Sequence, residues 1–469
     1  MSIMVPIALF GWIPVILLVF ASFPPRRAMI FCFVFGWLFL PPAGYEIPGF
    51  PDYTKVTATT FGVLLAIILF DWQQLLSIRC RLFDMPMICW CLCPFASSIS
   101  NGLGVYDGLS AIFEQTSKWG LPYLIGRVYL RNLNDFREVA IILFLGGLVY
   151  TPFCLWEIRM SPQLGRYLYG IGGVGIEYFN EFGKWGSRPR VFMGNALIVG
   201  TFMTAASLMG IWLWKTRCLT SLWGLSAASL TLLLLITTLL CKNLGALALL
   251  ALGTAALFST KRLHSSVVIY LLILASPLYM SLRITGKWSA TPLVNTAAII
   301  HEQRASSLQF RLNNEDLLAA KALQRPVFGW GRWGRARVYR EDGKDISVTD
   351  GLWVIALGNT GVVGLVTLTM AMLLPPVMFL RRYPARTWVH PAIAPAAALA
   401  VLVTLYMIDN LFNDMLNPIY VVTAGGLARL ATAQTTSCVI RQSQQGWVPQ
   451  PTANLTFPMD PRCQGQMTQ

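Results

Sequence analysis

The chain has 469 residues, of which 55% are hydrophobic and only 12% are charged, and its formal net charge is +15. Apolar runs close to membrane-spanning length recur along it, which excludes a soluble globular protein. Eight of the ten cysteines lie in apolar runs or short loops and none lies in the two long polar loops, so no disulfide framework is expected. We therefore predict an all-α integral membrane protein, a bundle of about 12–13 transmembrane helices with a large, partly helical external loop.

The apolar runs give the expected spans in chain order. The first run has neither a basic leading segment nor a small-residue cleavage site, so it is expected to be a helix and not a signal peptide. The expected spans cover residues 3–23, 28–42, 57–76, 85–100, 108–126, 139–156, 191–214, 220–241, 243–260, 264–283, 351–380, 388–410 and 416–433.

Basic residues fall on alternate short connections, and this pattern predicts the orientation. Such connections face the cytosol in polytopic proteins. The N-terminus is then outside and the polytopic bundle, residues 1–433, ends inside. The tail, residues 434–469, is rich in Gln, Pro and Thr and is expected to be disordered. The basic connections carry Arg26, Arg27, Arg79, Arg81, Arg127, Arg131, Arg137, Lys215, Arg217, Lys261, Arg262, Arg381, Arg382 and Arg386.

Two long loops, 157–190 and 284–350, are placed outside by this orientation, yet both are basic. Long loops are exempt from the orientation rule, so their charge needs another explanation. They either neutralise anionic lipid headgroups or bind a phosphorylated substrate, for which the planar guanidinium of arginine is well suited. The residues concerned are Arg159, Arg166, Lys184, Arg188 and Arg190 in the first loop, and Arg304, Arg311, Arg325, Arg332, Arg335, Arg337 and Arg340 in the second.

The second loop begins with an amphipathic pattern. Ser306 or Ser307 can cap a helix that runs to Arg325 and ends before Pro326. Arg311 and Glu315 lie one turn apart and are expected to pair. Three glycines follow, Gly329, Gly331 and Gly334, and they permit tight turns and close approach. Between them, Trp330 and Trp333 fit either interfacial anchoring or stacking on a sugar, and anchoring is favoured.

Polar residues inside or beside the apolar runs have plain structural explanations. Glu114 and Lys118 are one turn apart in a span and are expected to neutralise each other. The segment that follows them, Trp119 to Arg127, is expected to be a broken helix of the kind that lines a cavity. Asp409 and Asp414 flank a short external turn, where they contact an acceptor or face water, and water is favoured.

Several of these residues, in this order, resemble the O-antigen ligase and polymerase superfamily. The matching elements are Arg311 and its helix, the turn from Pro326 to Gly331, Asp350, and two glycines, Gly361 and Gly364, in the next span. A second element, from Arg188 to Asn195, leads from the other basic loop into a helix, where family members place a required arginine. The resemblance covers about a third of the chain by motif.

The resemblance implies a metal-independent, inverting glycosyltransferase without a cofactor. Its donor would be a glycan on undecaprenyl diphosphate and its acceptor a sugar hydroxyl, at the outer face of the bacterial inner membrane, among membrane lipids and without nucleic acid. Arg311, with Arg188 or Arg190, would stabilise the leaving diphosphate. Substrate binding would also involve Arg332, Arg335, Trp330 and Trp333.

The general base is the open point of this resemblance. Family ligases have a histidine where this chain has Asp350, so the chain resembles a polymerase-type member more than a strict ligase. Asp350 is interpreted as the base or as a cap of the following helix, and His301 is a reserve candidate. Another class of membrane glycosyltransferase keeps its acid in the first external loop, where Glu46 and Asp52 lie here. Rival functions are a transporter of lipid-linked glycans and a non-catalytic partner in polysaccharide assembly.

Overall fold

Helices make up nearly all of the secondary structure, and the all-α class is confirmed. The computed structural model describes residues 2–47, 50–77, 80–171, 186–289, 291–300 and 302–432. Within these ranges the strands form two short antiparallel hairpins, β1 (Gly44–Tyr45) with β2 (Tyr53–Thr54) and β3 (Ser221–Leu222) with β4 (Leu225–Ser226). The expectations for Arg79, Lys184, His301 and the tail beyond residue 432 lie outside the described residues.

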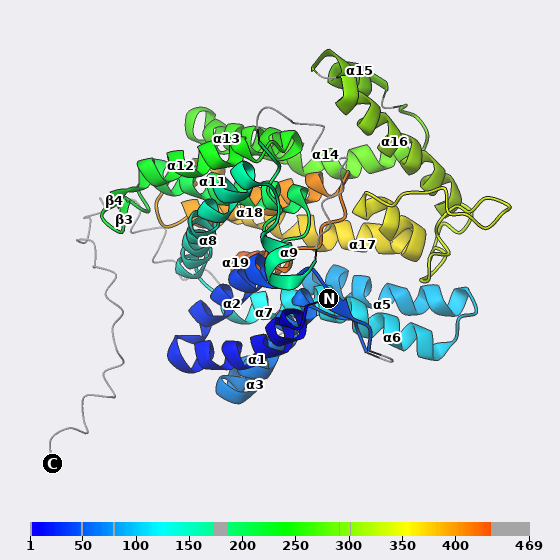
Figure 1. Ribbon diagram of the computed structural model, residues 1–469, viewed down its shortest axis with the longest axis horizontal. Coiled ribbons are helices and arrows are strands. Elements are labelled where there is room, and N and C mark those ends of the chain that lie inside the picture. The colour runs from blue at the N-terminus through cyan, green and yellow to red at the C-terminus, as the bar shows by residue number, and fades with distance from the viewer. Residues whose placement is uncertain are drawn as a thin grey trace. The chain divides into compact units, whose positions relative to one another are not determined.

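The helices follow one another through short connections in the first half of the chain (Figure 1). They are α1 (Met4–Ser22), α2 (Pro25–Phe39), α3 (Lys55–Phe70), α4 (Trp72–Leu76), η1 (Leu82–Asp84), α5 (Met85–Ser100), α6 (Val105–Gln115), η2 (Thr116–Gly120), α7 (Leu121–Tyr129), α8 (Leu133–Met160) and α9 (Leu164–Tyr169).

The second half has the longest helix and the arginine-rich connection that precedes it. Its helices are α11 (Ala196–Lys215), α12 (Ala227–Leu240), α13 (Leu244–Leu263), α14 (Val267–Ile284), α15 (Thr291–Ile300), α16 (Glu302–Ala322), α17 (Leu352–Arg382), η3 (Ala385–Thr387), α18 (Ala394–Asp409) and α19 (Pro418–Thr432).

By length and composition, this is a multi-pass membrane protein. Seven helical segments among the described residues are long and apolar enough to cross a membrane: Met4–Ser22, Leu82–Ser100, Leu133–Met160, Ala196–Lys215, Leu244–Leu263, Val267–Ile284 and Leu352–Arg382. Shorter apolar helices are Lys55–Phe70, Ala227–Leu240 and Ala394–Asp409. Two other expected spans are also too short to cross a membrane as straight helices: α2 and α19 have 15 residues each. Helices α2 and α19 begin at Pro25 and Pro418, and a helix does not readily extend back past a proline.

Two expectations about individual helices have definite outcomes. The expectation of a broken helix from Trp119 to Arg127 is wrong, because one turn of π-helix over Thr116–Gly120 joins α6 to α7 and the backbone stays helical on both sides. Such π-turns often occur at functional sites. The expected cap at Ser306 or Ser307 is wrong, because α16 already begins at Glu302.

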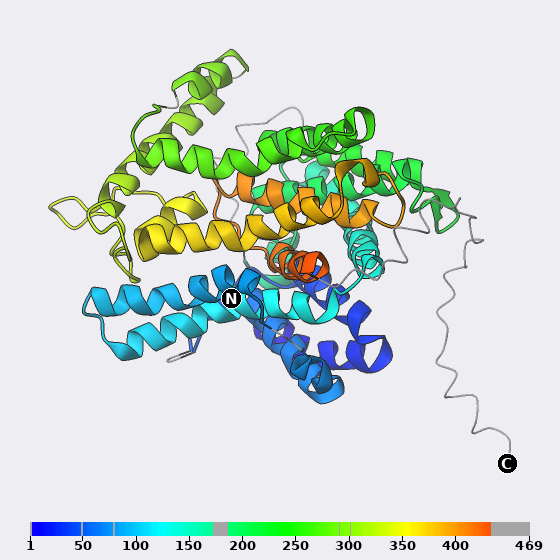
Figure 2. The ribbon, with the colours of Figure 1, turned by 180° about the vertical axis from the view of Figure 1, so that it is seen from behind.

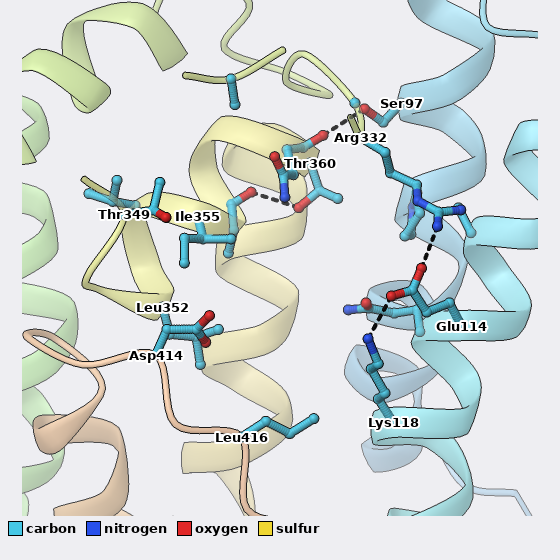
Figure 3. A pocket seen from close by; sticks show the side chains of 18 of the residues that line it. Ser97, Glu114, Lys118, Arg332, Thr349, Leu352, Ile355, Thr360, Asp414 and Leu416 are labelled. Atoms are coloured by element: carbon cyan, nitrogen blue, oxygen red, sulfur yellow. Dashed lines mark hydrogen bonds and ion pairs between the residues drawn. The ribbon is translucent and has the colours of Figure 1, made fainter. Parts of the chain in front are cut away.

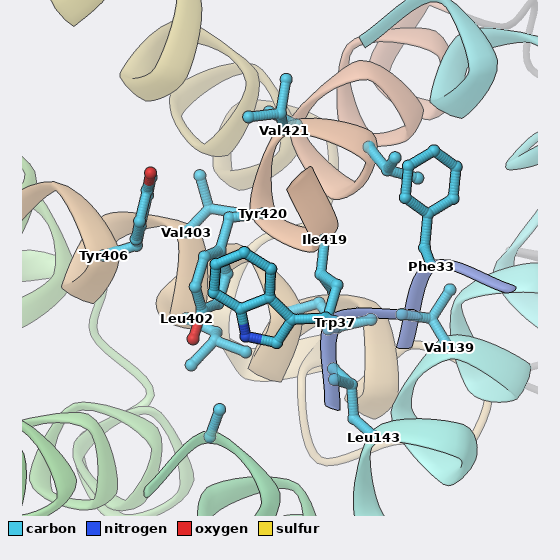
Figure 4. Close-up of a cluster of buried hydrophobic side chains, with 14 of the residues drawn as sticks. Phe33, Trp37, Val139, Leu143, Leu402, Val403, Tyr406, Ile419, Tyr420 and Val421 are labelled. Atoms are coloured by element: carbon cyan, nitrogen blue, oxygen red, sulfur yellow. The ribbon is translucent and has the colours of Figure 1, made fainter. Parts of the chain in front are cut away.

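The core is centred on α18, which is apolar on all sides and buried along most of its length. A helix of this kind must be surrounded by other helices, and α18 contacts α8, α11, α13, α14 and α17. Figure 4 shows the α18 side chains Leu402, Val403 and Tyr406 together with side chains of α2, α8 and α19, namely Phe33, Trp37, Val139, Leu143, Ile419, Tyr420 and Val421.

The neighbours of α17 determine where the arginine-rich connection lies. Helix α17 packs along α5, α5 packs along α6, and α16 packs on α17. Both ribbon views show α5 and α17 side by side (Figures 1 and 2). The connection from α16 to α17, residues 323–351, therefore lies beside α5 and α6.

Candidate functional site

Helix α17 is interrupted by a break that receives the arginine-rich connection. At Gly361 the backbone leaves helical geometry, with φ 68° and ψ −167°. A break frees backbone groups that need partners when they are buried. The connection supplies them: the Trp330 N–H donates to the Gly358 carbonyl at 2.8 Å, and the Val362 N–H donates to the Pro326 carbonyl at 2.7 Å.

Glycines make this close approach possible. A Cβ atom on Gly329 would lie 2.5 Å from the Gly358 carbonyl oxygen, and one on Gly361 would lie 2.2 Å from the Val327 carbonyl oxygen. Both distances are far below van der Waals contact, so only glycine fits at either position. The role predicted for Gly329, close approach of another segment, is confirmed.

Side chains of α5 also form hydrogen bonds to the connection and to α17 where these two segments meet, a place that we call the junction. The Ser97 hydroxyl donates to the Asn359 carbonyl at 2.7 Å, and the Asn101 amide donates to the Gly329 carbonyl at 2.9 Å. The Arg325 guanidinium donates to the Asn101 side-chain oxygen. Hydrogen bonds thus join α5 to the connection and to α17, which lie more than 220 residues further along the chain.

A cavity of about 620 Å³ lies next to this junction. Its walls come mainly from α5, α6, η2, the connection, the start of α17 and the turn between α18 and α19 (Figure 3), with single residues from β2, α3 and α16. Five charged side chains line it, the basic Lys118, Arg332 and Arg337 and the acidic Glu114 and Asp414. The cavity is therefore a charged site beside an otherwise apolar helix bundle.

Glu114 lies between two of the cations. Its Oε1 is 2.6 Å from the Lys118 Nζ, and its Oε2 is 2.5 Å from an Nη atom of Arg332 (Figure 3). The expected pairing of Glu114 with Lys118 is confirmed, but Arg332 completes the arrangement. The shared carboxylate holds both basic side chains at the cavity wall.

Arg337 is fixed within the connection itself. Its Nη1 lies 2.6 Å from an Asp345 carboxylate oxygen, and its Nη2 lies 3.5 Å from the Thr349 hydroxyl. The Arg337 hydrogen bond, with further bonds from Ser347, lowers the pKa of Asp345 to about 2. Asp345 is thus ionised at neutral pH and keeps the guanidinium in place.

The two residues expected to be catalytic, Arg311 and Asp350, are brought together but do not line the cavity. The Arg311 Nε is 3.6 Å from an Asp350 oxygen, and its Nη1 donates to the Phe412 carbonyl at 2.8 Å. It also donates to the Asn413 side-chain oxygen at 3.2 Å. Arg311 therefore fixes the turn between α18 and α19.

The interpretation of Asp350 as a helix cap is wrong. Helix α17 begins at Leu352 after Gly351, and no side chain caps it. The Leu352 N–H donates instead to the backbone carbonyls of Asn410, at 3.0 Å, and Asn413, at 3.2 Å. The same turn that Arg311 holds thus satisfies the first turn of α17.

The expected pairing of Arg311 with Glu315 is also wrong. Glu315 is buried against α14, where it accepts a hydrogen bond from the Tyr279 hydroxyl at 2.7 Å and lies 3.4 Å from the Arg283 Nε. Burial raises the pKa of Glu315, while Tyr279 and Arg283 oppose that shift. The spacing allows a pair, but Glu315 binds Tyr279 and Arg283. Arg311 binds Asp350 and the Phe412 carbonyl instead.

The tryptophans of the connection have different surroundings. Trp330 donates to the Lys321 carbonyl at 2.8 Å, and its ring lies 3.9 Å from the Lys321 Nζ and 4.5 Å from the Arg325 guanidinium carbon. Trp333 lines the cavity, is 72% exposed and donates to Asp107 at 2.7 Å. Its φ of 65° is unusual for a bulky residue, and such strain persists only where the surroundings hold it.

The arginines of the first basic loop lie elsewhere in the fold. The fully buried Glu157 of α8 accepts the backbone N–H groups of Leu164 at 2.9 Å, Arg190 at 2.8 Å and Val191 at 2.7 Å. In the part of the chain that the structure describes, neither Arg188 nor Arg190 lines the cavity. Nor does Arg335, although its neighbours Gly334 and Ala336 do.

Sequence reasoning undervalued two of the cavity residues and missed others. For Lys118 the sequence predicts charge neutralisation, and for Asp414 it favours solvent over contact with an acceptor. Ser97 and Asn359 were missed, although each interrupts an apolar run with a polar side chain, which is a usable signal in a membrane helix. Within the described residues, no group of three or more His, Cys, Asp or Glu side chains is placed to hold a metal ion.

Comparison of the sequence with models of known protein families gave no match, and comparison with curated proteins gave none either.

Proposed function

We propose that the protein is a membrane glycosyltransferase, whose donor is a glycan on undecaprenyl diphosphate and whose acceptor is a sugar hydroxyl. The proposal is carried by one observation: Lys118, Arg332 and Arg337 face a single cavity of about 620 Å³. Ligand sites typically measure about 300–1,000 Å³. Three basic groups in such a space suit a substrate with two phosphates. On the orientation that the charge pattern predicts, the cavity opens at the outer face of a bacterial inner membrane.

The chemistry explains why fixed cations help. When the bond between the sugar and the diphosphate breaks, negative charge moves onto the phosphate oxygens. Guanidinium groups already in place stabilise this charge more in the transition state than in the bound substrate, so they lower the barrier. Glu114 holds Arg332 at 2.5 Å and Asp345 holds Arg337 at 2.6 Å. Neither side chain then has to be ordered when the donor binds.

The sugars of the donor and acceptor need a surface of another kind. Trp333 lies at the cavity with most of its ring exposed, and an aromatic face suits the apolar face of a sugar ring. We assign Trp333 to sugar stacking. Trp330, which is covered by Lys321 and Arg325, we assign to the structure of the connection. These two roles replace the interfacial anchoring that the sequence favours for Trp330 and Trp333.

One observation favours a second function, transport of a lipid-linked glycan. Substrate sites of many transporters are built on interrupted helices, and α17 is interrupted at Gly361 beside the cavity. The connection that fills the break, however, donates and accepts backbone hydrogen bonds there. We therefore interpret the break as a docking point for the connection and rank transport second.

Reconstitution into liposomes separates the candidates. The purified protein is given undecaprenyl-diphosphate oligosaccharide extracted from the host membrane, together with an oligosaccharide acceptor. A glycosyltransferase releases undecaprenyl diphosphate and forms a longer glycan in equal amounts. A transporter moves the intact donor between leaflets without release, and an assembly partner does neither. Either of the last two results would refute the proposed function.

A matched pair of variants ties the activity to the cavity. Arg332→Ala removes a cavity cation and is expected to lower turnover on the order of 100- to 1,000-fold, as loss of one transition-state donor does. Arg340 belongs to the same connection but is exposed and away from the cavity. Arg340→Ala therefore makes the same change of charge and should leave turnover unchanged. Equal effects of the two changes would mean that only the net charge of the connection matters.

A further inference from the structure

The turn between α18 and α19 presents one carboxylate to the cavity, that of Asp414. Figure 3 shows Asp414 on the side of the cavity opposite Glu114 and Lys118. Asp414 does not belong to the arginine-rich connection, so that connection does not determine where its carboxylate lies. Its position depends on a separate turn near the end of the bundle.

Asp414 differs from Glu114, the other acidic side chain of the cavity, and from the nearby Asp345 and Asp350. Glu114 is shared by Lys118 and Arg332, Asp345 is paired with Arg337, and Asp350 is paired with Arg311. Within the described residues, the Asp414 carboxylate takes part in no hydrogen bond and no ion pair. It is also exposed, so its oxygens are free to accept a proton and to release it to water.

The backbone that carries Asp414 is nevertheless well fixed on both sides. Before it, the Asn413 side-chain amide donates to the Asp409 carboxylate at 2.9 Å, and the Asn413 side-chain oxygen accepts a hydrogen bond from the Arg311 guanidinium at 3.2 Å. After it, the Met415 carbonyl accepts a hydrogen bond from the Tyr406 hydroxyl at 3.2 Å. A free side chain on a fixed backbone is the arrangement expected of a group that acts on a bound substrate.

We propose that Asp414 is the catalytic base of the reaction, an inference that rests on the proposed function. The acceptor hydroxyl would lie between Asp414 and the donor sugar. Its oxygen forms the new bond to the anomeric carbon, and its proton passes to the Asp414 carboxylate. The bond from the anomeric carbon to the diphosphate breaks, and the diphosphate leaves with the electron pair. Asp414 then releases the proton to water.

The surrounding charges favour Asp414 over the two alternatives. Glu114 already binds two cations and Asp350 is bound to one, so their oxygens are less available to an acceptor hydroxyl than those of Asp414. The pKa of Asp414 is raised, because the surrounding protein desolvates its carboxylate, and Lys118 across the cavity (Figure 3) opposes part of that shift. Arg311 becomes a positioning residue, because it holds the turn on which Asp414 lies.

The test compares Asp414→Asn with three other variants in the liposome assay, alongside binding of undecaprenyl diphosphate measured separately. Asp414→Asn removes the base but keeps the shape, so turnover should fall on the order of 100- to 10,000-fold while binding of undecaprenyl diphosphate stays within twofold of the parent protein. Asp414→Glu should recover part of the turnover. Asp342→Asn, an exposed carboxylate in the connection, should change neither property. Asp350→Asn should lower turnover less than tenfold.

Each failure has a distinct meaning. If the parent protein transfers no glycan, the proposed function is wrong and the assignment of Asp414 falls with it. If the parent protein is active and Asp414→Asn is equally active, only the assignment of the base is wrong. It is also wrong if Asp414→Asn loses binding as strongly as turnover, or if Asp350→Asn shows the larger loss.

Discussion

The backbone N–H of Val362 donates to the Pro326 carbonyl at 2.7 Å, and this bond connects the arginine-rich connection to the break in α17. A membrane helix that stops and restarts exposes backbone groups that lipid cannot satisfy. Here another segment of the chain satisfies them. The position of Arg332 at the cavity follows from this attachment, since Arg332 lies only six residues beyond Pro326.

Gly361→Ala should detach the connection from α17. The new Cβ would lie 2.2 Å from the Val327 carbonyl oxygen, and φ is already 68°. Backbone strain of about 1–3 kcal/mol is added to this collision, so the apparent melting temperature in detergent should fall and turnover should be lost. Gly343→Ala is the control: its φ is 80°, but nothing lies within 4 Å, so it carries strain alone. Equal melting temperatures for the two variants would contradict the docking contact.

Arg311→Ala should abolish detectable product while the protein stays in the membrane at normal levels. The change removes the hydrogen bonds to Phe412 and Asn413 and the ion pair with Asp350. A small displacement of a catalytic group can cost on the order of 100-fold in rate. Arg311→Lys should recover little, because one ammonium cannot replace a forked set of donors. Full activity of Arg311→Ala, measured as glycan product per membrane protein, would remove Arg311 from the site.

Glu114→Gln should strengthen binding of undecaprenyl diphosphate. The substitution removes the anion shared by Lys118 and Arg332, so a phosphate no longer competes with a carboxylate for these cations. Because the three side chains are about a quarter exposed, we expect a change of up to about 1 kcal/mol, several-fold in Kd. Titration at low and high salt checks this, since the gain should shrink as salt rises. Weaker binding at both salt concentrations would show that Glu114 mainly organises the site.

The pKa of Asp345 predicts how the stability of the protein changes at low pH. Arg337 and Ser347 lower the pKa of Asp345 from 3.8 to about 2. A lowered pKa in the folded state means that the contribution to stability is present above the ordinary pKa and is lost as pH falls through about 2. Asp345→Asn should therefore melt below the parent protein at pH 6, and the difference should disappear as the pH approaches 2. A difference that stays constant down to that pH would exclude ionisation of Asp345 as its cause.

Glu157→Gln should loosen the segment that carries Arg188 and Arg190. Glu157 accepts backbone N–H groups through both carboxylate oxygens, and an amide offers only one such oxygen. Leaving a buried donor unsatisfied costs about 1–3 kcal/mol. Glu138→Gln, on the same helix but partly exposed and paired with Arg27, is the control. Limited proteolysis after residue 185 measures the effect, and equal cleavage of the two variants would refute it.

The local features of the chain could be predicted because their causes are local. The span expected at residues 85–100 is α5, and the one expected at 351–380 is α17 within two residues at either end. The close approach of Gly329 followed from its glycine pattern. The pairing of Arg311 with Glu315 did not follow from spacing, because α16 directs Glu315 toward Tyr279.

The site itself could be predicted only in part. The sequence predicts that the arginine-rich connection contains the candidate site and that Arg332 belongs to it, and Arg332 does line the cavity. Asp414 and Lys118 were set aside, since each has an ordinary explanation when only its neighbours in sequence are considered. Their place at the cavity depends on how α6 and the last turn pack against α17.

Hydropathy and the clustering of basic residues determined that this is a helical membrane protein with a charged connection. Each segment that lies in lipid must be apolar by itself, so it can be recognised from its own residues. The tertiary structure alone decided which charges share a cavity. Arg332 and Glu114 are 218 positions apart, and Arg311 and Asn413 are 102 apart. The attraction between two charges depends on their distance in space and not on their separation in sequence. These pairs therefore form only when the helices pack.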